Sequence, residues 1–530
     1  MSLKRLAAAL VAVAAALVVL PQPGRAQAVY GQIFGTVRDA SGGAIPGAEV
    51  TITDVGKGTV FTVVTNDSGN YTKTRLIPGK YQVKVALAGF KTFVQDDVTV
   101  IADGAARVDA TLAVGQISDL VIVTGETPLL KSDRADTSTV LQEKAVTELP
   151  LLNRNFTELQ LLTPGTSKQT WQHASSENPQ GSTQIMVNGL PFFGTGFMLD
   201  GTDNRDPILG IIVINPVLES VQEFKMTTSN FDAEFGNAQS AVITAQTKSG
   251  TNLFHGSAYE FLRNSATNAR NPFSESPELL GGKRIPPAQW NQFGGTAGGP
   301  VIKNKAFYFG YFEGTRQRNG SSVLTTVPTS AARGGDLSAY GRPIYDPKTG
   351  ASDGSGRALF GGAIIPSTRL STPALYLLKQ IPTPNTGTAG AVENNYAAGG
   401  TEQLDSNQVG GRGDWNFSSN FHIFGRYSIA NFNKAAPGAF GELVGGKELN
   451  FIGFAGTSHV RNQSIASGFD YTLSPSLLTD FRFGYYRYLV RVRPGGAGKT
   501  PAKDAGIPGL NVNDFTADMP DFNITGVGGF

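Results

Sequence analysis

The 530-residue sequence contains no cysteine, so disulfide bonds and thiolate metal sites are not available to it. It also contains only four histidines. The histidines lie far apart along the chain, and a histidine-rich metal site is therefore not expected. Charged residues make up only 16% of the chain, and the formal net charge is +2. A nucleic-acid-binding protein needs a dense basic patch, so the composition argues against a nucleic-acid partner.

Long apolar runs are also missing from the sequence after residue 20, and no transmembrane helix is expected there. The single run, residues 6–20, follows Lys4 and Arg5 and precedes the small-residue motif at residues 26–28. As a helix it would reach only about 22 Å, which is too short for a membrane span. The pattern predicts a secretory signal peptide over residues 1–28.

Catalytic signatures are equally missing, since no nucleophile–base pair, metal-ligand spacing or phosphate-binding loop stands out. Glu219 and Glu223 are four residues apart, but paired acids on a solvated helix face are common. We therefore expect a protein that is not an enzyme and has no cofactor.

Two aromatic hairpins late in the chain are the clearest positive feature, because apolar and polar side chains alternate along them with a period of two. The first contains Val409, Trp415, Phe417, Phe421, Ile423, Tyr427 and Ile429 on its apolar face. The second contains Ile465, Phe469, Tyr471, Leu473, Leu477, Phe481, Phe483 and Tyr485. Strands of about ten residues, aromatic on one face and joined by tight turns, are typical of outer-membrane barrels. Soluble β-sandwiches alternate in the same way, so the hairpins alone leave both folds open.

Residues 29–115 contain short β-rich runs separated by turn clusters such as Ser41-Gly42-Gly43 and Asp67-Ser68-Gly69-Asn70, which predicts a β-sandwich. The segments GTVRDASGGAIPGAEVTI, TNDSGNYTKTRLIPGKYQVKV and AGFKT resemble the carboxypeptidase-regulatory-like domain, with its transthyretin- or starch-binding-like fold. Members of that superfamily include carbohydrate binders, but function travels weakly with the fold. A structural spacer and a carbohydrate-binding module are both open for this segment.

Residues 118–245 form a mixed region in which the sequence predicts strands at 184–187, 197–199 and 241–247. Apolar spacing predicts short helices at 139–148, 151–162 and 217–224. The segments ELPLLNRNFTELQLLTPG, FMLDGTDN and ESVQEFKMTTSNFDAEFGNAQSAVITAQTKSGTNLFHG resemble the plug of TonB-dependent outer-membrane receptors of the Oar-like group. Receptors outside that group carry Arg-Gly-Pro where Met226-Thr227-Thr228-Ser229 stands here, which weakens transfer from iron–siderophore receptors.

Residues 246–530 read as hairpins and long polar loops, with 315–405 expected to be mostly loop. The segment QFGGTAGGPVIKNKAFYFGYFEG resembles the early barrel of the same group. Family barrels have 22 strands, whereas this stretch has room for about eight to twelve. The fold class implied is mainly β: an N-terminal β-sandwich, an α/β plug and a partial antiparallel transmembrane β-barrel. The chain is expected to be a C-terminally truncated fragment.

The resemblance implies active uptake of a large substrate, with carbohydrates and peptides among the candidates. It places the protein in the bacterial outer membrane, among its lipids, with the N-terminal domain in the periplasm. It also implies a TonB-type energy-coupling complex as partner. The candidate contact is the strand Val121, Ile122, Val123, Thr124 and Gly125, through addition to a partner's sheet edge. An ordinary linker strand is the alternative reading of this segment. The alternative function is a surface carbohydrate-binding or adhesion protein without transport.

Two short motifs have a structural and a functional reading. Arg412-Gly413-Asp414 spells an integrin-type tripeptide, but it falls inside a predicted barrel strand. Asp200 and Asp203 could hold a cation together, although Asp200-Gly201 also fits a tight turn. We expect the structural reading for both motifs. The residues that bind the transported ligand cannot be assigned from the sequence.

Overall fold

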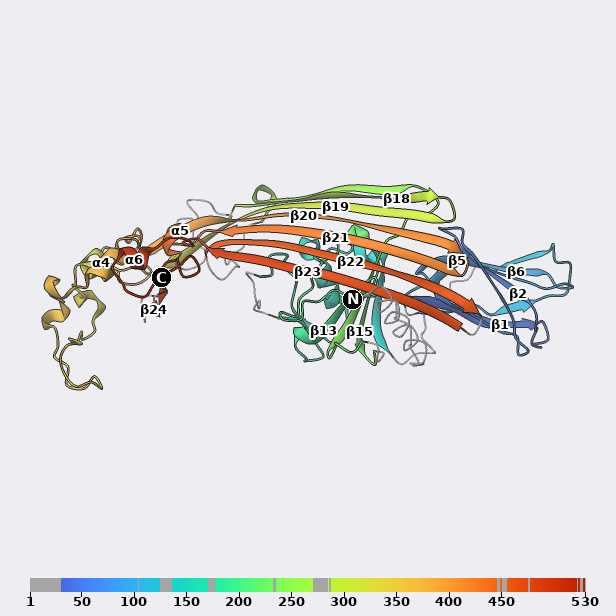
Figure 1. Cartoon of the computed structure of the whole chain (residues 1–530), viewed down its shortest axis with the longest axis horizontal. Helices are drawn as coiled ribbons and strands as arrows, with labels where there is room; N and C mark the ends of the chain where they lie inside the picture. The colour runs from blue at the N-terminus through green and yellow to red at the C-terminus, as the bar shows by residue number, and fades with distance from the viewer. Residues whose placement is uncertain are drawn as a thin grey trace, which may run out of the picture.

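The computed structural model describes residues 30–102, 104–123, 136–169, 177–231, 235–269, 285, 287–445, 449, 455–474, 477–521, 523–524 and 528–529. The predicted signal peptide lies outside the described residues. A small sandwich lies at one end of the molecule, and a long curved sheet occupies its middle (Figure 1). A second, smaller sheet lies under the concave face of the long one, and loops with short helices form the far end.

The N-terminal sandwich consists of two sheets packed over an apolar core. One sheet contains β1 (Gly31–Asp39), β4 (Asn70–Leu76), β7 (Ala105–Arg107) and β8 (Ala110–Leu112). The other has the order β3 (Val60–Val64), β2 (Glu49–Asp54), β5 (Gly79–Ala86), β6 (Thr92–Val100) and β9 (Leu120–Val123). Buried residues alternate along β1 and β5, so one face of each sheet supplies the core. The sandwich predicted from the sequence is confirmed.

The region predicted as the plug contains a five-stranded sheet in the order β10 (Thr137–Gln142), β15 (Val221–Ser229), β16 (Ala241–Thr247), β13 (Thr195–Leu199) and β14 (Thr202–Asp203). A short helix α2 (Glu143–Glu148) and the 3₁₀ segments η1 (Leu152–Arg154) and η2 (Phe156–Leu162) follow β10. Every residue of β16 is buried, because it is a central strand with both faces covered. Among the described strands, the edge strand β10 pairs with β15 alone.

Seven consecutive antiparallel strands form the curved wall, in which each strand pairs with its neighbour in sequence. They are β17 (His255–Asn264), β18 (Ala288–Ile302), β19 (Ala306–Thr325), β20 (Tyr396–Ser418), β21 (Phe421–Ala436), β22 (Gly456–Ser474) and β23 (Leu477–Pro494). Short turns join β18 to β19, β20 to β21 and β22 to β23 at one end, whereas long connections lie at the other. The wall is open, since β17 and β23 do not pair with each other.

The side-chain pattern of the wall fits a sheet with lipid on its convex face. The aromatic and aliphatic side chains of the two predicted hairpins, among them Trp415, Phe417, Tyr427, Phe481 and Tyr485, are exposed. The alternate residues of the same strands are mostly buried against the plug. The mainly β fold class, with an antiparallel barrel wall, is therefore confirmed. None of the helices among the described residues combines the length and the apolar character needed to cross a membrane.

None of the three helices predicted in the plug forms over its full predicted range. Residues 217–224 form the 3₁₀ turn η4 (Leu218–Ser220) and the start of β15, which pairs with β10 and β16 and is buried on both faces. A strand that is buried on both faces need not alternate between apolar and polar residues, so the helical spacing was misleading. Residues 139–148 begin as strand β10 and become helical only at α2. Residues 151–162 form two 3₁₀ segments, interrupted where Asn153 adopts a left-handed backbone.

The wall also differs from its prediction. Within the predicted loop 315–405, β19 continues to Thr325 and β20 begins at Tyr396. Their outer parts are rich in glycine and polar residues on both faces, so the alternation that marks a strand is weak there. The described part of the wall has seven strands, fewer than the eight to twelve that chain length alone allowed.

Candidate functional site

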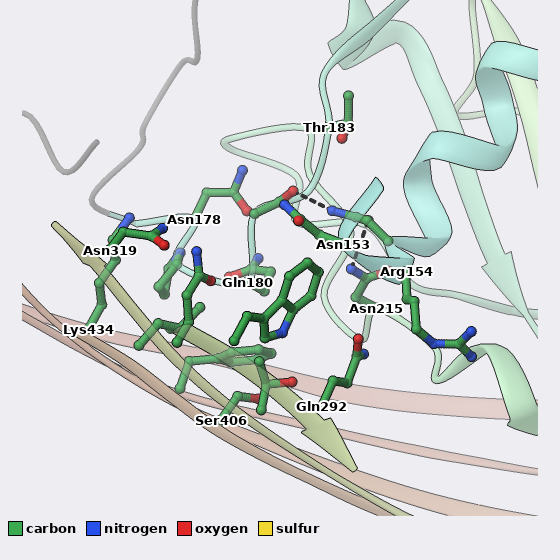
Figure 2. Close-up of a pocket in the computed structure, with 18 of the residues that line it drawn as sticks. Asn153, Arg154, Asn178, Gln180, Thr183, Asn215, Gln292, Asn319, Ser406 and Lys434 are labelled. Atoms are coloured by element: carbon green, nitrogen blue, oxygen red, sulfur yellow. Dashed lines mark hydrogen bonds between the residues drawn. The ribbon is translucent and has the colours of Figure 1, made fainter. Parts of the chain in front are cut away.

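A cavity of about 820 Å³ lies between the plug and the concave face of the wall. Its wall side is contributed by β18, β19, β20 and β21, near the ends that carry the long connections. Its plug side is contributed by the segments around Asn153, Asn178 and Asn215. Figure 2 shows these plug residues facing Gln292, Ser406 and Lys434 of the wall across the cavity. The two faces together enclose the candidate site.

Most of the wall residues of the cavity come from one face of each strand. These are Ala288, Trp290 and Gln292 on β18, Glu313, Thr315, Gln317 and Asn319 on β19, Glu402, Leu404, Ser406 and Gln408 on β20, and Phe432 and Lys434 on β21. Consecutive members of this set on a strand are two residues apart, as a pleated sheet requires for one face. Arg263 of β17 and Gln289 of β18 also line the cavity. Strand register aligns Asn319 with Glu402. The cavity is therefore bounded by a rigid sheet rather than by loops.

The plug residues are held by a network of amide hydrogen bonds. Asn153 and Arg154 both have positive φ angles, 58° and 50°, so the chain turns sharply there. The Asn155 amide donates to the Gly181 carbonyl at 2.6 Å and its oxygen accepts from Asn215 at 3.2 Å. These bonds join three separate plug segments. The plug face of the cavity is thus pre-organised before any ligand arrives.

Several buried polar atoms on the cavity lining have no hydrogen-bond partner among the described residues. Four are acceptors, namely Gln292 Oε1, Glu402 Oε2, Asn215 Oδ1 and Gln180 Oε1, and two are donors, the indole nitrogen of Trp290 and Nε of Arg154. Gln292 and Glu402 are each only 5% exposed. Buried polar groups without partners are costly and are rare away from functional sites. A ligand rich in hydrogen-bond donors would complete this set.

The charges around the cavity are largely paired. Lys434 lies 2.9 Å from Glu402, Lys168 lies 2.9 Å from Glu158, and Arg154 pairs with Glu219. The Arg154 guanidinium also stacks 4.0 Å from the ring centre of Phe261, which fixes its direction. Paired cations provide little uncompensated positive charge for an anionic ligand. The cavity instead offers amides, one indole, these ion pairs and Arg263, which forms no ion pair among the described residues.

None of these cavity residues was identified from the sequence, which left the substrate site unassigned. The available signal was the polar face of each wall strand on the side of the long connections. Gln408 lies on the polar face of the first predicted hairpin, but the sequence does not place the plug segments opposite it. The plug segments and the polar face of the wall come together only when the plug docks against the wall. No periodic pattern in the sequence predicts this docking.

The predicted energy-coupling strand is divided between described and undescribed residues. Val121, Ile122 and Val123 lie in β9, whereas Thr124 and Gly125 lie outside the described part of the chain. β9 is the last strand of its sheet and pairs in parallel with β6 alone. The side chains of Leu120 and Ile122 are 61% and 60% exposed. Its role as the contact with an energy-coupling protein stays a prediction.

The two ambiguous motifs belong to one buried ion network between plug and wall. Arg412 on β20 donates to Asp200 at 3.0 Å and to Asp414 at 2.9 Å. Asp200 has φ 51° in the turn after β13 and also accepts from the Thr247 amide at 2.8 Å. Arg412 is therefore buried inside the wall, and Asp200 is satisfied by protein donors. Among the described residues, no group of three or more His, Cys, Asp or Glu side chains is arranged to hold a metal ion.

The sandwich contacts both the wall and the plug at the end with the short turns. Arg75 lies 2.9 Å from Asp480, and Tyr30 donates to Asp470. On the plug, the Glu223 carboxylate accepts from the Ala102 amide at 2.8 Å. Burial raises the pKa of Glu223 to about 7, although the Ala102 amide and the nearby Lys225 favour the charged form.

Glu223 should make the stability of the protein fall as pH rises from about 4.5 to about 7. Over that range the folded state keeps a proton that the unfolded state has released. Raising the pH therefore favours the unfolded state. Glu223→Gln keeps the acceptor for Ala102 and removes the titration. We expect the variant to match the wild type near pH 4.5 and to exceed it at pH 8 by up to about 3 kcal/mol. Thermal unfolding at both pH values measures this, and equal pH dependence in the two proteins would contradict it.

Comparison with known families divides the chain in two. Residues 246–530 match the family described as "Outer membrane beta barrel domain", and residues 32–113 match the "Carboxypeptidase regulatory-like domain". The TonB-dependent transporter Oar of Myxococcus xanthus is 25% identical over 291 residues, which cover 53% of this chain and 26% of Oar. The chain thus spans about a quarter of the length of that relative.

Solved structures give weaker likenesses. The outer membrane transporter YddB from Escherichia coli has a TM-score of 0.40 and 11% identity, covering 66% of this chain and 39% of YddB. The siderophore receptor PirA from Acinetobacter baumannii has a TM-score of 0.32 and 13% identity, covering 67% and 45%. A putative carbohydrate binding protein from Bacteroides uniformis has a TM-score of 0.14 and 21% identity, covering 15% and 40%.

Proposed function

Since the chain belongs to the outer-membrane β-barrel family, we propose that it acts in the active uptake of a large ligand across the bacterial outer membrane. The ligand enters from the side of the long connections and binds in the cavity between plug and wall. A TonB-type complex then pulls on the chain near β9 and remodels the plug. The observation that carries the proposal is the cavity itself, with six buried polar atoms that have no partner among the described residues.

This proposal assigns each part of the chain a task. Residues 29–115 form a periplasmic sandwich, residues 118–245 the plug, and residues 246–530 the barrel wall. The sandwich serves as a structural module that carries β9 at its edge. The similarity to Oar, which is named a TonB-dependent transporter, supports a role in transport.

The cavity favours a neutral ligand rich in hydroxyl or amide groups. Its unpartnered atoms are mostly acceptors, which hydroxyl and amide protons satisfy, and the face of Trp290 suits an apolar sugar or side-chain surface. Carbohydrates and peptides both meet this description. An anionic iron chelate fits less well, because the three cations described above are each paired with a carboxylate.

The energy-coupling step follows from the position of β9. Its outer edge has no paired strand among the described residues, so its main chain can accept a strand from another protein. The chain then leads to β10, which is the edge strand of the plug sheet. Tension applied at β9 would therefore reach the plug at the strand with a single sheet partner.

A surface binding or adhesion protein is the second candidate, since the cavity would serve binding without transport. Under this function, the cavity variants should change the ligand affinity by the same factors as under transport. It differs in that β9 would be irrelevant and that bound ligand would stay outside the cell.

Gln292→Leu is expected to weaken ligand binding about tenfold to a hundredfold, because it replaces a buried cavity acceptor with an apolar group of similar size. The assay uses the purified protein and fluorescent panels of neutral oligosaccharides and neutral peptides. Gln463→Leu is the matched control, since Gln463 lies on the outer face of β22 and bonds only to Tyr427. If no panel member binds, or if both variants bind as the wild type does, the cavity is not the ligand site.

A further inference from the structure

A cluster of basic side chains lies on the outer face of the wall, where β22 and β23 approach the long connections. Arg461 on β22 is opposite Leu489 on β23, and Arg487 and Arg491 lie two residues to either side of Leu489. His459 is opposite Arg491. All four basic residues are exposed and occupy the alternate positions of their strands that face the lipid. We call these residues, Arg461, Arg487, Arg491 and His459, the outer basic cluster.

No ion pair joins the cluster to an acidic side chain among the residues that the structure describes. The outward positions of β21, β22 and β23, which are their odd-numbered residues, carry no aspartate or glutamate. Arg461 donates to Asn431 at 2.9 Å, and His459 bonds with Asn433 at 2.8 Å. These amide contacts orient the side chains but leave the guanidinium charges uncompensated. Diagonal neighbours across a sheet are about 7–8 Å apart, so the arginines repel each other unless an anion lies between them.

The height of the cluster on the wall indicates which anion is available. Exposed apolar residues on β23 run from Leu477 to Tyr485, eight residues apart, or about 26 Å along the strand. With a strand tilt of about 40° this corresponds to a band roughly 20 Å high, close to the apolar belt of outer-membrane barrels. Ile465 ends the apolar run on β22 at the same level. Arg487 and Arg461 come immediately above, at the level of the lipid headgroups.

We propose that the outer basic cluster binds the phosphate groups of an anionic glycolipid in the outer leaflet of the membrane. Arginine matches phosphate geometry with paired donors, and its aliphatic stem can lie along the apolar band below. Arg487 and Arg491 lie on β23, on either side of the position opposite Arg461 on β22. They can therefore contact a phosphate from both sides. The site is independent of the central cavity, because the cluster lies on the outer face of the wall and the cavity lies against its inner face.

The wall also provides a matched control. Arg316 and Arg318 lie on the outer face of β19, but Arg318 forms a two-point ion pair with Asp405 at 2.8 and 3.1 Å. Arg316 donates to Asn407 at 2.9 Å and to the Ser406 carbonyl at 2.7 Å. Removing these two arginines changes the net charge by the same amount as removing Arg461 and Arg491. It does not remove the uncompensated charge of the cluster.

The test measures binding of bis-phosphorylated lipid A to the purified protein in neutral detergent by native mass spectrometry. R461Q/R491Q should weaken binding at least tenfold, whereas R316Q/R318Q should stay within about twofold of the wild type. R461K/R491K, which keeps the charge, should retain most of the binding and shows that the positions tolerate substitution. Lipid A without phosphates should bind all variants equally weakly. Equal losses in the test and control pairs, or equal binding of dephosphorylated lipid A, would overturn the proposal.

Discussion

Ile122→Pro in β9 should abolish binding of a TonB periplasmic domain while leaving ligand affinity at the cavity unchanged. Strand addition depends on main-chain hydrogen bonds, and proline removes a donor and restricts the preceding residue. We expect the affinity for the TonB domain to fall at least a hundredfold. Isothermal titration with the purified domain measures this directly, and deletion of residues 121–125 should have the same effect on uptake in cells.

Ile122→Thr is the control for that variant, since threonine keeps the strand propensity and changes only the side chain. It should bind the TonB domain within a few fold of the wild type. If the proline and threonine variants behave alike, the contact is not made through the main chain of β9. If neither change affects uptake, β9 is an ordinary linker strand.

Arg412→Met should destabilise the seating of the plug in the wall by about 3–5 kcal/mol, because it leaves Asp200 and Asp414 buried with one cation fewer. Both carboxylates have side chains only 1% exposed. The partner Arg426, 2.7 Å from Asp200, compensates only one of them. Chemical unfolding measures the loss, and limited proteolysis should show earlier cleavage within the plug.

Arg318→Met is the matched control on the outer face of the same wall. Its ion pair with Asp405 is about one-third exposed, and such pairs contribute about 1 kcal/mol or less. Arg412→Lys should fall between the two, since it keeps the charge but loses the fork of donors. Equal destabilisation by Arg412→Met and Arg318→Met would contradict an anchoring role for the buried network.

The sequence predicted those strands whose two faces have different surroundings. In the hairpins around Trp415 and Phe481, lipid and plug impose opposite demands on alternate residues, and the period of two is therefore visible. The sandwich was predictable for the same reason, since its sheets have one buried face. The resemblance then ordered the parts along the chain.

Prediction failed where burial removes the pattern. β15 is covered on both faces, so its apolar residues fitted a helix as well as a strand. The outer parts of β19 and β20 are polar on both faces and looked like loops. The cavity needs Asn215 of the plug opposite Gln292 of the wall, and only the docking of two separately folded sheets brings them together. The paired roles of Asp200 and Arg412 depend on the same docking.

The central claim, energy-driven uptake, is tested most directly by following a labelled ligand in cells that produce this protein. The probe is whichever panel oligosaccharide or peptide the purified protein binds, and its accumulation is compared with and without a protonophore. We predict equal binding at the cell surface in both conditions and accumulation inside the outer membrane only when the proton gradient is intact. Accumulation that ignores the protonophore, or surface binding with no accumulation in either condition, would contradict the account.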